Sequence, residues 1–244
     1  MPERKPLSIG VLIIGSLYWD ERRQTWREAR LNMGESFNVP MRIRYGRLST
    51  GRDNTYTMVF SGQAGEGQAK VVRCRQDIVN AADLDVETNE LWAAERNMKA
   101  DGSIASDWGC VALLCNPASK VPAAFTDAWA ARVRAVSGYG GIPHVPGEET
   151  PVSAAGLLKV PWPVVAGTNG SVPLDLLIAT ANHPTLAGDP KSYPSPKMIA
   201  DAWLTKEAVK NDRVAYFRNN VANGINTFED ADIAALLDGA HRHQ

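Results

Sequence analysis

The sequence predicts an α+β fold around a mainly antiparallel β-sheet. Short segments with strand character are separated by turn residues, and the helical segments do not alternate with them in the regular βαβ order of a parallel sheet. The length of 244 residues suits one large domain, and 44% apolar with 22% charged residues is the composition of an ordinary folded protein. We therefore expect a single domain over residues 1–244.

The first half of the chain is predicted to consist mainly of strands. Residues 8–14 form a continuous apolar run that ends at Gly15, which is typical of a strand buried on both faces. A loop followed by a helix is expected over residues 18–31, with Gly34 as the stop signal. Alternating residues bounded by Gly, Asn and Asp then predict three short strands, at residues 40–48, 55–60 and 68–73.

The second half of the chain is richer in helices. Residues 83–99 contain many alanines and glutamates and predict a helix, whereas residues 109–115 predict a buried strand. A short helix at residues 126–136 precedes the Pro- and Gly-rich residues 138–170, which we expect to form an insertion with edge strands. The remaining predicted elements are a strand at 172–179, a Pro-rich loop at 184–196, and helices at 197–223 and 228–237.

Composition and charge narrow the class of protein. The 26 Lys and Arg residues balance 27 Asp and Glu residues, and the net charge of -1 argues against non-specific binding to nucleic acid. Three cysteines do not make a disulfide framework in a chain of this length, and the first apolar run is too short to span a membrane. We expect a cytoplasmic protein with a small-molecule substrate and with no nucleic-acid or membrane partner, while no particular oligomeric state is indicated.

The chain lacks the short motifs that mark phosphate-binding loops, dinucleotide sites, serine hydrolases and zinc proteases. His144 and His183 lie in Pro-rich loops, where a surface position is more common than a metal ligand. Cys110 and Cys115 flank an apolar strand, where cysteine usually packs as a small hydrophobe rather than acting as a nucleophile. We therefore expect no metal and no cofactor.

A group of arginines lies on and just after the predicted strand at residues 40–48, and comprises Arg42, Arg44, Arg47 and Arg52. These side chains form either a solvated strand face or a surface for an anionic ligand or nucleic acid. The alternation of the strand favours the solvated face, because it turns the arginines outward.

The residues that follow the first strand form a candidate binding turn. Gly15 allows the backbone to turn sharply, and the N–H groups of Ser16 to Tyr18 would then point into one concavity, free of the sheet. Such a cluster of N–H groups binds anions such as carboxylates. The alternative is a strand that simply ends at a Gly-Ser pair.

Glu95 is the candidate catalytic residue. On a helix it shares one stripe with the apolar residues Leu91 and Met98, so its carboxylate is expected to be partly buried. Burial would raise the pKa of this carboxyl group toward neutrality, as a general base or acid requires. The alternative is an ion pair with Arg96 or Arg73.

Two other glutamates on the same predicted helix, Glu87 and Glu90, do not share the apolar stripe as well as Glu95. We interpret them as solvated charges on the outer face of the helix.

In their order along the chain, these features resemble the gamma-glutamylcyclotransferase-like superfamily. Its members open with a strand ending in Tyr-Gly-Ser-Asn/Leu, which Ile14-Gly15-Ser16-Leu17 resembles. Residues 42–49 and 56–59 are similar to the strand, loop and strand that follow in the family. The resemblance covers residues 8–115 and 197–238 and leaves an insertion at about 120–195.

Two further segments carry the resemblance. The family's catalytic glutamate lies in Leu-Asp-x-x-Glu-Gly, and residues 91–96 match this pattern at Leu91 and Glu95. Near the C-terminus the family often has a tyrosine, an apolar residue and glycines before a last helix, to which Tyr216, Val221 and Gly224 are similar. Ile14 stands in place of the usual aromatic residue, and Trp92 and Arg96 replace the Asp and Gly beside the glutamate; these departures concern the substrate more than the fold.

The resemblance implies a small, closed or nearly closed β-barrel with flanking helices and a pocket between the Gly15 turn and Glu95. In such enzymes the glutamate takes a proton from the free α-amino group of a γ-glutamyl amine, which attacks the γ-carbonyl group and releases 5-oxoproline. The substrate-binding residues that the resemblance implies are Ile14, Gly15, Ser16, Leu17, Tyr18 and Tyr216.

Two other functions remain open from the sequence. The same fold could serve a non-catalytic binding or regulatory protein, in which case Trp19 or Trp92 would plug the pocket. Alternatively, the Pro- and Gly-rich residues 138–196 could form a protein-interaction module without a deep pocket.

Overall fold

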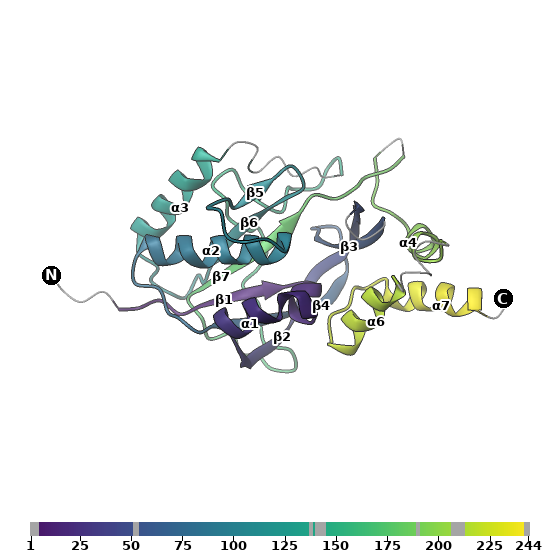
Figure 1. The fold of residues 1–244 in the computed structure, drawn as a ribbon, viewed down its shortest axis with the longest axis horizontal. Helices are drawn as coiled ribbons and strands as arrows, with labels where there is room; N and C mark the ends of the chain where they lie inside the picture. The colour runs from purple at the N-terminus through teal and green to yellow at the C-terminus, as the bar shows by residue number, and fades with distance from the viewer. Residues whose placement is uncertain are drawn as a thin grey trace.

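The computed structural model describes residues 5–50, 54–136, 139, 145–188, 191–205 and 213–241. Within these ranges a seven-stranded sheet runs through the molecule in the order β3-β2-β4-β1-β7-β6-β5 (Figure 1). The strands are β1 Ile9–Ile13, β2 Leu31–Ser49, β3 Thr55–Phe60, β4 Glu66–Cys74, β5 Ala105–Ser106, β6 Gly109–Cys115 and β7 Leu176–Asn182. The helices and 3-10 turns are η1 Ser16–Tyr18, η2 Glu21–Arg23, α1 Gln24–Arg30, α2 Ala81–Arg96, α3 Ala123–Ala135, α4 Pro196–Trp203, α6 Val214–Ala222 and α7 Asp230–His241.

The sheet is mixed but mainly antiparallel. Five of its six strand pairings are antiparallel, and β1 and β7 form the parallel pair. The predicted α+β class is therefore confirmed. The sheet is not closed, because its edge strands β3 and β5 do not pair with each other and β5 offers only two residues for pairing. The barrel implied by the resemblance is thus not confirmed, although the sheet curls enough to bring β3 near β7.

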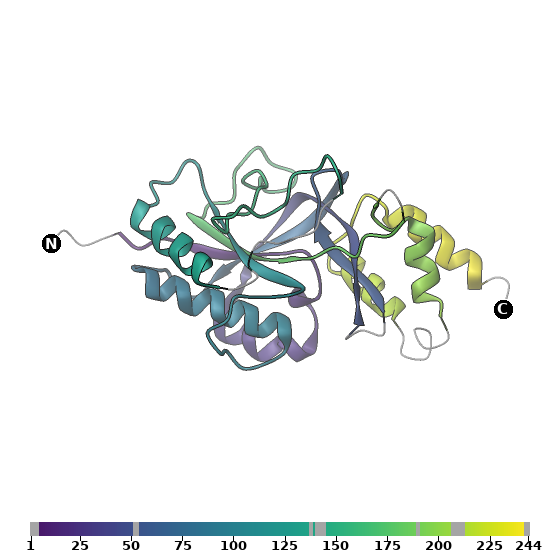
Figure 2. The ribbon, with the colours of Figure 1, turned by 90° about the horizontal axis from the view of Figure 1, so that it is seen from above.

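The first strand is buried on both faces, as its apolar run predicts. Ile9, Val11 and Ile13 pack into one apolar cluster, whereas Leu12 and Ile14 point into the cluster on the opposite face. Helices α1, α2 and α3 lie on the side of Ile9 and Val11 (Figure 2). The strand therefore forms the centre of the molecule, and its last residue lies between two packed layers.

The helix that carries Glu95 has well-defined ends. The side chain of Asn80 accepts a hydrogen bond from the Asp83 N–H, and the carboxylate of Asp83 accepts one from the Asn80 N–H. At the other end Asn97 adopts a left-handed conformation with φ of 57°, which stops the helix. The helix predicted at 83–99 is confirmed, but Met98 lies beyond its end and is exposed. Glu95 therefore occupies the last turn.

The C-terminal helices pack against the far end of the β2–β3 ribbon (Figure 1). The ring of Tyr45 on β2 lies 5.0 Å from the ring of Trp203 and 6.5 Å from that of Phe217, centre to centre. These aromatic contacts fix α6, which carries Tyr216, over the end of the sheet. None of the described helices has the length and apolarity needed to cross a membrane.

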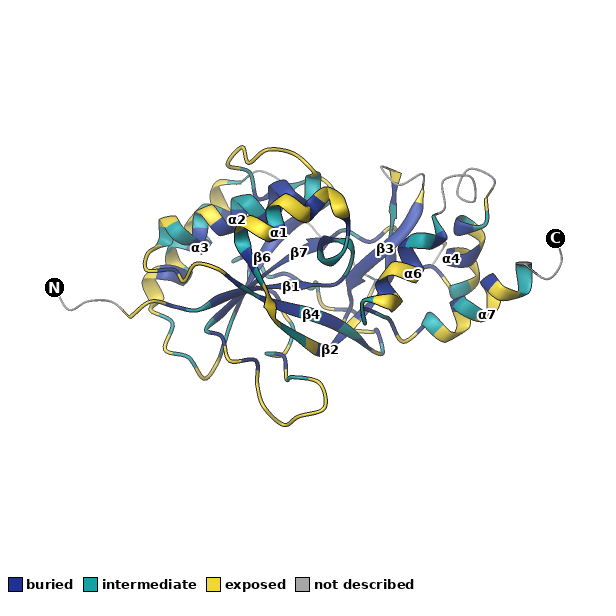
Figure 3. Ribbon diagram, turned by 60° about the horizontal axis from the view of Figure 1, so that its bottom comes forward, coloured by how far each residue is buried: buried dark blue, intermediate teal, exposed yellow. Residues whose placement is uncertain are grey.

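The segment expected as an insertion contributes to the core where it is described. Val152, Leu158, Val172 and Leu174 are buried on the face of the sheet opposite α2. Over residues 145–171 the structure has isolated bridges, one of them between Leu157 and Leu113, rather than the expected edge strands. Figure 3 shows the result: the strands are buried along most of their length, and exposed positions gather on outer helix faces and loops.

Two predicted boundaries are wrong in ways that affect the site. Strand β2 begins at Leu31, directly after α1, because its first half pairs with β4; Gly34 is therefore inside a strand and is not a helix stop. The strand predicted at 172–179 is β7, which runs three residues further, to Asn182. This extension places two polar side chains, Thr180 and Asn182, at the carboxyl end of β7.

Candidate active site

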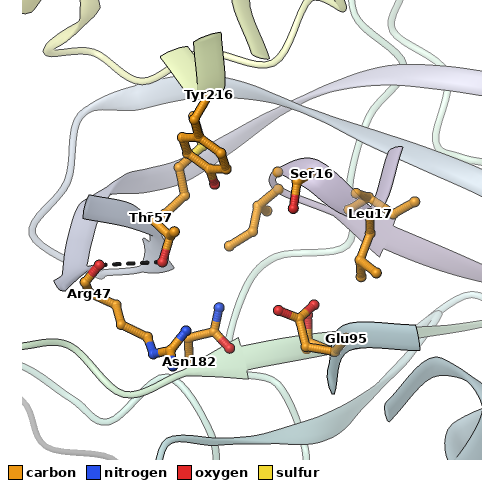
Figure 4. Close-up of a pocket in the computed structure, with 12 residues that line it drawn as sticks. Ser16, Leu17, Arg47, Thr57, Glu95, Asn182 and Tyr216 are labelled. Atoms are coloured by element: carbon orange, nitrogen blue, oxygen red, sulfur yellow. Dashed lines mark hydrogen bonds between the residues drawn. The ribbon is translucent and has the colours of Figure 1, made fainter. Parts of the chain in front are cut away.

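A pocket lies at the carboxyl ends of the parallel strands β1 and β7, the edge at which loops between strands most readily form ligand sites. The cavity between its walls is small, about 40 Å³, and it opens to solvent. The lining residues come from the end of β1 and the following turn, from three strands, and from two helices (Figure 4). They are Ile13, Ile14, Gly15, Ser16 and Leu17, then Arg47, Thr57, Met58, Thr180 and Asn182, then Glu95 and Tyr216.

The structure thus places six of the seven residues predicted from the sequence around one pocket. Tyr18 stands apart from the others: its ring lies 5.1 Å from the Lys70 ammonium group, and its hydroxyl group is 3.4 Å from that of Ser36. Residues 16–18 form a 3-10 turn, in which successive side chains point about 120° apart. A turn that directs Ser16 and Leu17 to the pocket therefore directs Tyr18 elsewhere.

The turn offers fewer backbone donors than expected. The Tyr18 N–H donates to the carbonyl oxygen of Gly15 at 3.2 Å, and the Trp19 N–H donates to that of Ser16 at 3.2 Å. The expectation that the N–H of Tyr18 is free to bind an anion is therefore wrong, because the chain closes a hydrogen-bonded turn instead of an open nest. The turn therefore supplies fewer backbone donors to a ligand than an open nest would.

Gly15 is required by the close approach of Tyr216 across the pocket. A Cβ atom built on Gly15 would lie 2.8 Å from the Tyr216 hydroxyl oxygen, which is closer than atoms of this kind normally approach. Tyr216 is itself buried, and its ring packs edge-on against Trp19 at 5.8 Å. The turn and α6 can therefore pack this closely only because Gly15 has no side chain.

We expect Gly15→Ala to lower the free energy of unfolding by about 1–2 kcal/mol, because Tyr216 must move to accommodate the added methyl group. In a Tyr216→Phe background the same substitution should cost less, since the hydroxyl oxygen that meets the methyl group is gone. Denaturant unfolding of the four proteins measures this coupling. Gly34→Ala, whose Cβ would meet no atom closer than 3.6 Å, is the matched control; equal costs of Gly15→Ala in both backgrounds would contradict the contact.

The carboxylate of Glu95 faces the pocket from the last turn of α2. It is partly exposed, and its Oε2 accepts a hydrogen bond of 3.1 Å from the Thr180 hydroxyl group on β7. The backbone carbonyl oxygen of Glu95 accepts a bond of 3.2 Å from Arg23, which holds the helix end. The ion-pair partners considered from the sequence are engaged elsewhere: Arg96 with Asp101 at 2.8 Å and Arg73 with Asp77 at 3.0 Å.

The interpretation of Glu87 as a solvated charge is wrong. Only 4% of this residue is exposed, and its carboxylate pairs with Arg30 of α1. Burial raises the pKa of the Glu87 carboxyl group, while the hydrogen bond from Arg30 acts in the opposite direction. Glu87 therefore joins α1 to α2 beneath the surface and lies outside the pocket, whereas Glu90 on the same helix is partly exposed.

Arg47 and Thr57 enter the pocket because of a bulge in β2. The pairing of β2 with β3 shifts between Tyr45 and Arg47, and Arg47 then lies opposite Thr57. The hydroxyl group of Thr57 donates a hydrogen bond of 3.3 Å to the backbone carbonyl oxygen of Arg47 (Figure 4). Gly46 occupies the bulge, where a Cβ atom would lie 2.5 Å from a methyl carbon of Val59. A prediction that assumes strict alternation of side chains along the strand does not include this shift in pairing.

The other predicted arginines have different surroundings. Arg42 is exposed, in agreement with a solvated face, and donates to the Gly62 carbonyl oxygen at 3.0 Å. Arg44 is mostly buried and pairs with Glu229 at 2.6 Å, so the solvated interpretation is wrong for it. Arg52 lies outside the described residues.

The two tryptophans that could have plugged the pocket lie beside it. Trp92 is fully buried under α2, where its ring stacks on Trp108 at 4.7 Å. The indole N–H of Trp19 donates to the side-chain oxygen of Asn220 at 2.7 Å. Neither residue is part of the pocket lining.

The remaining candidates do not form a second reactive centre in the part of the chain that the structure describes. No group of three or more His, Cys, Asp and Glu residues there is arranged to hold a metal ion. Burial lowers the pKa of His183, which directly follows β7, and Cys110 and Cys115 form no disulfide. His144 lies outside the described residues.

Comparisons with known proteins give no relative: no family model, curated protein or solved structure matches the chain.

Proposed function

We propose that the protein is a gamma-glutamylcyclotransferase-like enzyme that acts on a γ-glutamyl amine, with Glu95 as the general base. The observation that carries this proposal is the meeting of Glu95 with the Gly15–Leu17 turn around one polar pocket. These two features stand 80 residues apart in the sequence, and each has a chemical role in the cyclisation. The curl that brings β3 near β7, and so forms the pocket, is also what a barrel-like cyclotransferase fold would require.

The reaction needs a base next to the α-amino group and hydrogen-bond donors next to the γ-carbonyl oxygen. Glu95 accepts a hydrogen bond from the substrate ammonium group and takes one proton. The freed nitrogen then attacks the γ-carbonyl carbon, and the new carbon–nitrogen bond closes a five-membered ring. In this proposal the γ-carbonyl oxygen, on which negative charge develops, faces the Gly15–Leu17 turn.

Collapse of this intermediate breaks the bond between the γ-carbon and the leaving nitrogen. The two protons lost by the α-nitrogen end on the leaving nitrogen, with Glu95 as carrier, and the products are 5-oxoproline and the free amine. Thr180 supports the cycle, because its hydroxyl group holds Oε2 of Glu95 and leaves the other carboxylate oxygen for the substrate. The chemistry thus uses only groups of this chain.

The departures beside the glutamate are compatible with this role. Trp92 occupies the family's aspartate position and is directed into the core, and Arg96 at the glycine position pairs with Asp101. Neither side chain lines the pocket. We propose a cytoplasmic location for the activity, in keeping with Cys74, Cys110 and Cys115, which form no disulfide.

The direct test is release of 5-oxoproline from a panel of γ-glutamyl amino acids, γ-glutamyl peptides and simple γ-glutamyl amines. We expect release from at least one class and none from the same compound carrying an N-acetyl group, because acetylation removes the attacking amine. If the purified protein releases 5-oxoproline from no member of the panel, the catalytic proposal fails. A pocket that binds these compounds without turnover would then support the non-catalytic binding protein.

A further inference from the structure

We propose that a second cavity, separate from the candidate active site, binds a neutral aromatic compound of two fused rings. The second cavity lies between strands β2 and β3 on one side and residues 149–151 and 159–164 on the other. Its volume is about 260 Å³, and it shares no lining residue with the candidate active site. The proposal does not depend on the proposed function.

The floor of the second cavity is apolar and buried. Met41 of β2 and Phe60 of β3 line it and are 4% and 2% exposed, and Pro163 is buried as well. Farther out, Trp162 is half-buried and 38% of Val164 is exposed. Apolar side chains therefore continue from the core to the rim, where an apolar ligand gains stability by leaving water.

The wall formed by residues 159–164 is held in place on both sides. The Val172 N–H donates to the Pro163 carbonyl oxygen at 3.0 Å, and the Ala166 N–H donates to the Asn38 carbonyl oxygen of β2 at 2.8 Å. Four lining residues are prolines, whose rings fix the φ angle: Pro40, Pro151, Pro161 and Pro163. The second cavity is thus preformed, and a ligand loses little affinity to ordering of the chain.

Trp162 gives this wall its aromatic character. Its indole N–H donates to the Val172 carbonyl oxygen at 3.1 Å, so the polar group of the side chain is satisfied without a ligand. The rest of the indole is apolar ring surface, which packs favourably against another aromatic ring. Phe60 adds a second ring to the lining. The lining therefore favours an aromatic ligand.

The charges of the second cavity lie at its rim and balance. Its four charged lining residues are all exposed, two of them cationic and two acidic: Arg42, Lys159, Glu66 and Glu149. The Lys159 ammonium group lies 3.9 Å from the Glu149 carboxylate, and Arg42 lies opposite Glu66 in the pairing of β2 with β4. A charged ligand would lose hydration without meeting an excess of opposite charge. The rim therefore favours a neutral ligand.

The volume sets the size of the ligand. An apolar protein cavity of about 150 Å³ holds one benzene ring. The second cavity, with about 260 Å³, has room for two fused rings. Indole is a soluble, neutral probe of that size. Indole-3-acetate and tryptamine carry an anionic and a cationic group on the same ring system, and they test the preference for a neutral ligand.

The test measures the dissociation constants of these three compounds by calorimetry, with ligand-dependent thermal stabilisation as a second readout. The variants are Trp162→Ala, which removes the ring from the wall, Trp162→Phe, which keeps one, and Val164→Asp, which adds a charge at the rim. The matched control is Val86→Asp, at a valine of α2 that is 47% exposed and lies outside the second cavity.

We expect indole to bind wild type with a dissociation constant below about 1 mM, and no more weakly than either charged compound. Trp162→Ala should weaken the binding of indole about 10-fold, and Trp162→Phe should stay within about threefold of wild type. Val164→Asp should weaken it about fivefold, because a carboxylate then stands beside an apolar ligand. Val86→Asp should behave as wild type.

Thermal unfolding without ligand shows whether each variant folds, and the outcome of Val164→Asp decides if Trp162→Ala does not. The proposal is overturned if wild type does not bind indole, if a charged compound binds more tightly, or if Val164→Asp binds indole as wild type does. Glu95→Gln should also bind indole as wild type does, because Glu95 does not line the second cavity. Loss of binding in that variant would place indole in the candidate active site instead.

Discussion

Replacing Glu95 by glutamine is expected to lower the rate of 5-oxoproline release by about 10²–10⁴-fold, the usual contribution of a general base. Glutamine keeps the shape of the side chain and can still accept the hydrogen bond from Thr180, but it cannot take a proton. The thermal unfolding midpoint should therefore remain close to that of wild type, and the γ-glutamyl substrate should still bind. Steady-state kinetics on the best γ-glutamyl substrate, together with thermal unfolding, measures both effects.

Glu90→Gln is the matched control for this experiment. It makes the same chemical change on the same helix, at a partly exposed residue that does not line the pocket. We expect its turnover to stay within a factor of two of wild type. Should Glu95→Gln lose stability while its turnover persists, Glu95 would be a structural residue and another group would have to act as the base.

Removal of Arg30 is expected to have the largest effect on stability. The side chain of Glu87 is only 4% exposed. Arg30→Met leaves its carboxylate without a cationic partner between α1 and α2. Breaking a pair of this kind costs about 3 kcal/mol in the free energy of unfolding at neutral pH. The double variant Arg30→Met/Glu87→Leu should recover much of the loss, because it also removes the buried charge.

The cost of Arg30→Met should depend on pH. Burial already raises the pKa of the Glu87 carboxyl group in the folded protein, and loss of Arg30 removes the interaction that lowers it. The folded state then binds a proton at a pH where the unfolded state does not, so the stability of the variant falls as pH rises through that window. Urea unfolding at pH 5 and pH 8 should show the smaller penalty at pH 5. A penalty that is equal at both values would contradict this account.

Much of the site's location could be anticipated from local patterns. The first strand is recognisable because a run of apolar residues is what burial on both faces demands, and Gly15 marks its end. The helix around Glu95 is recognisable from its many alanines and glutamates. Each of these sequence signals lies within a single strand or helix, and each reflects the short-range conformational preferences of its residues.

The apolar stripe of Leu91, Glu95 and Met98 that the sequence predicts is incomplete, because the helix ends before Met98 and that side chain is exposed. What directs Glu95 to the pocket is the packing of the last turn of α2 beside β7, where Thr180 meets its carboxylate. The same packing decides that Glu87, rather than Glu95, forms the buried ion pair.

By itself the sequence determined the fold class, the central buried strand, the turn at Gly15 and the helix that carries Glu95. Tertiary structure alone decided that the sheet stays open, that Tyr18 leaves the pocket, and that Arg47 and Asn182 enter it. The bulge at Gly46 reverses the alternation of β2, and pairing with β6 extends β7 to Asn182. Both effects come from hydrogen bonds between neighbouring strands of the sheet. Such pairing cannot be predicted from the alternation of apolar and polar residues within one strand.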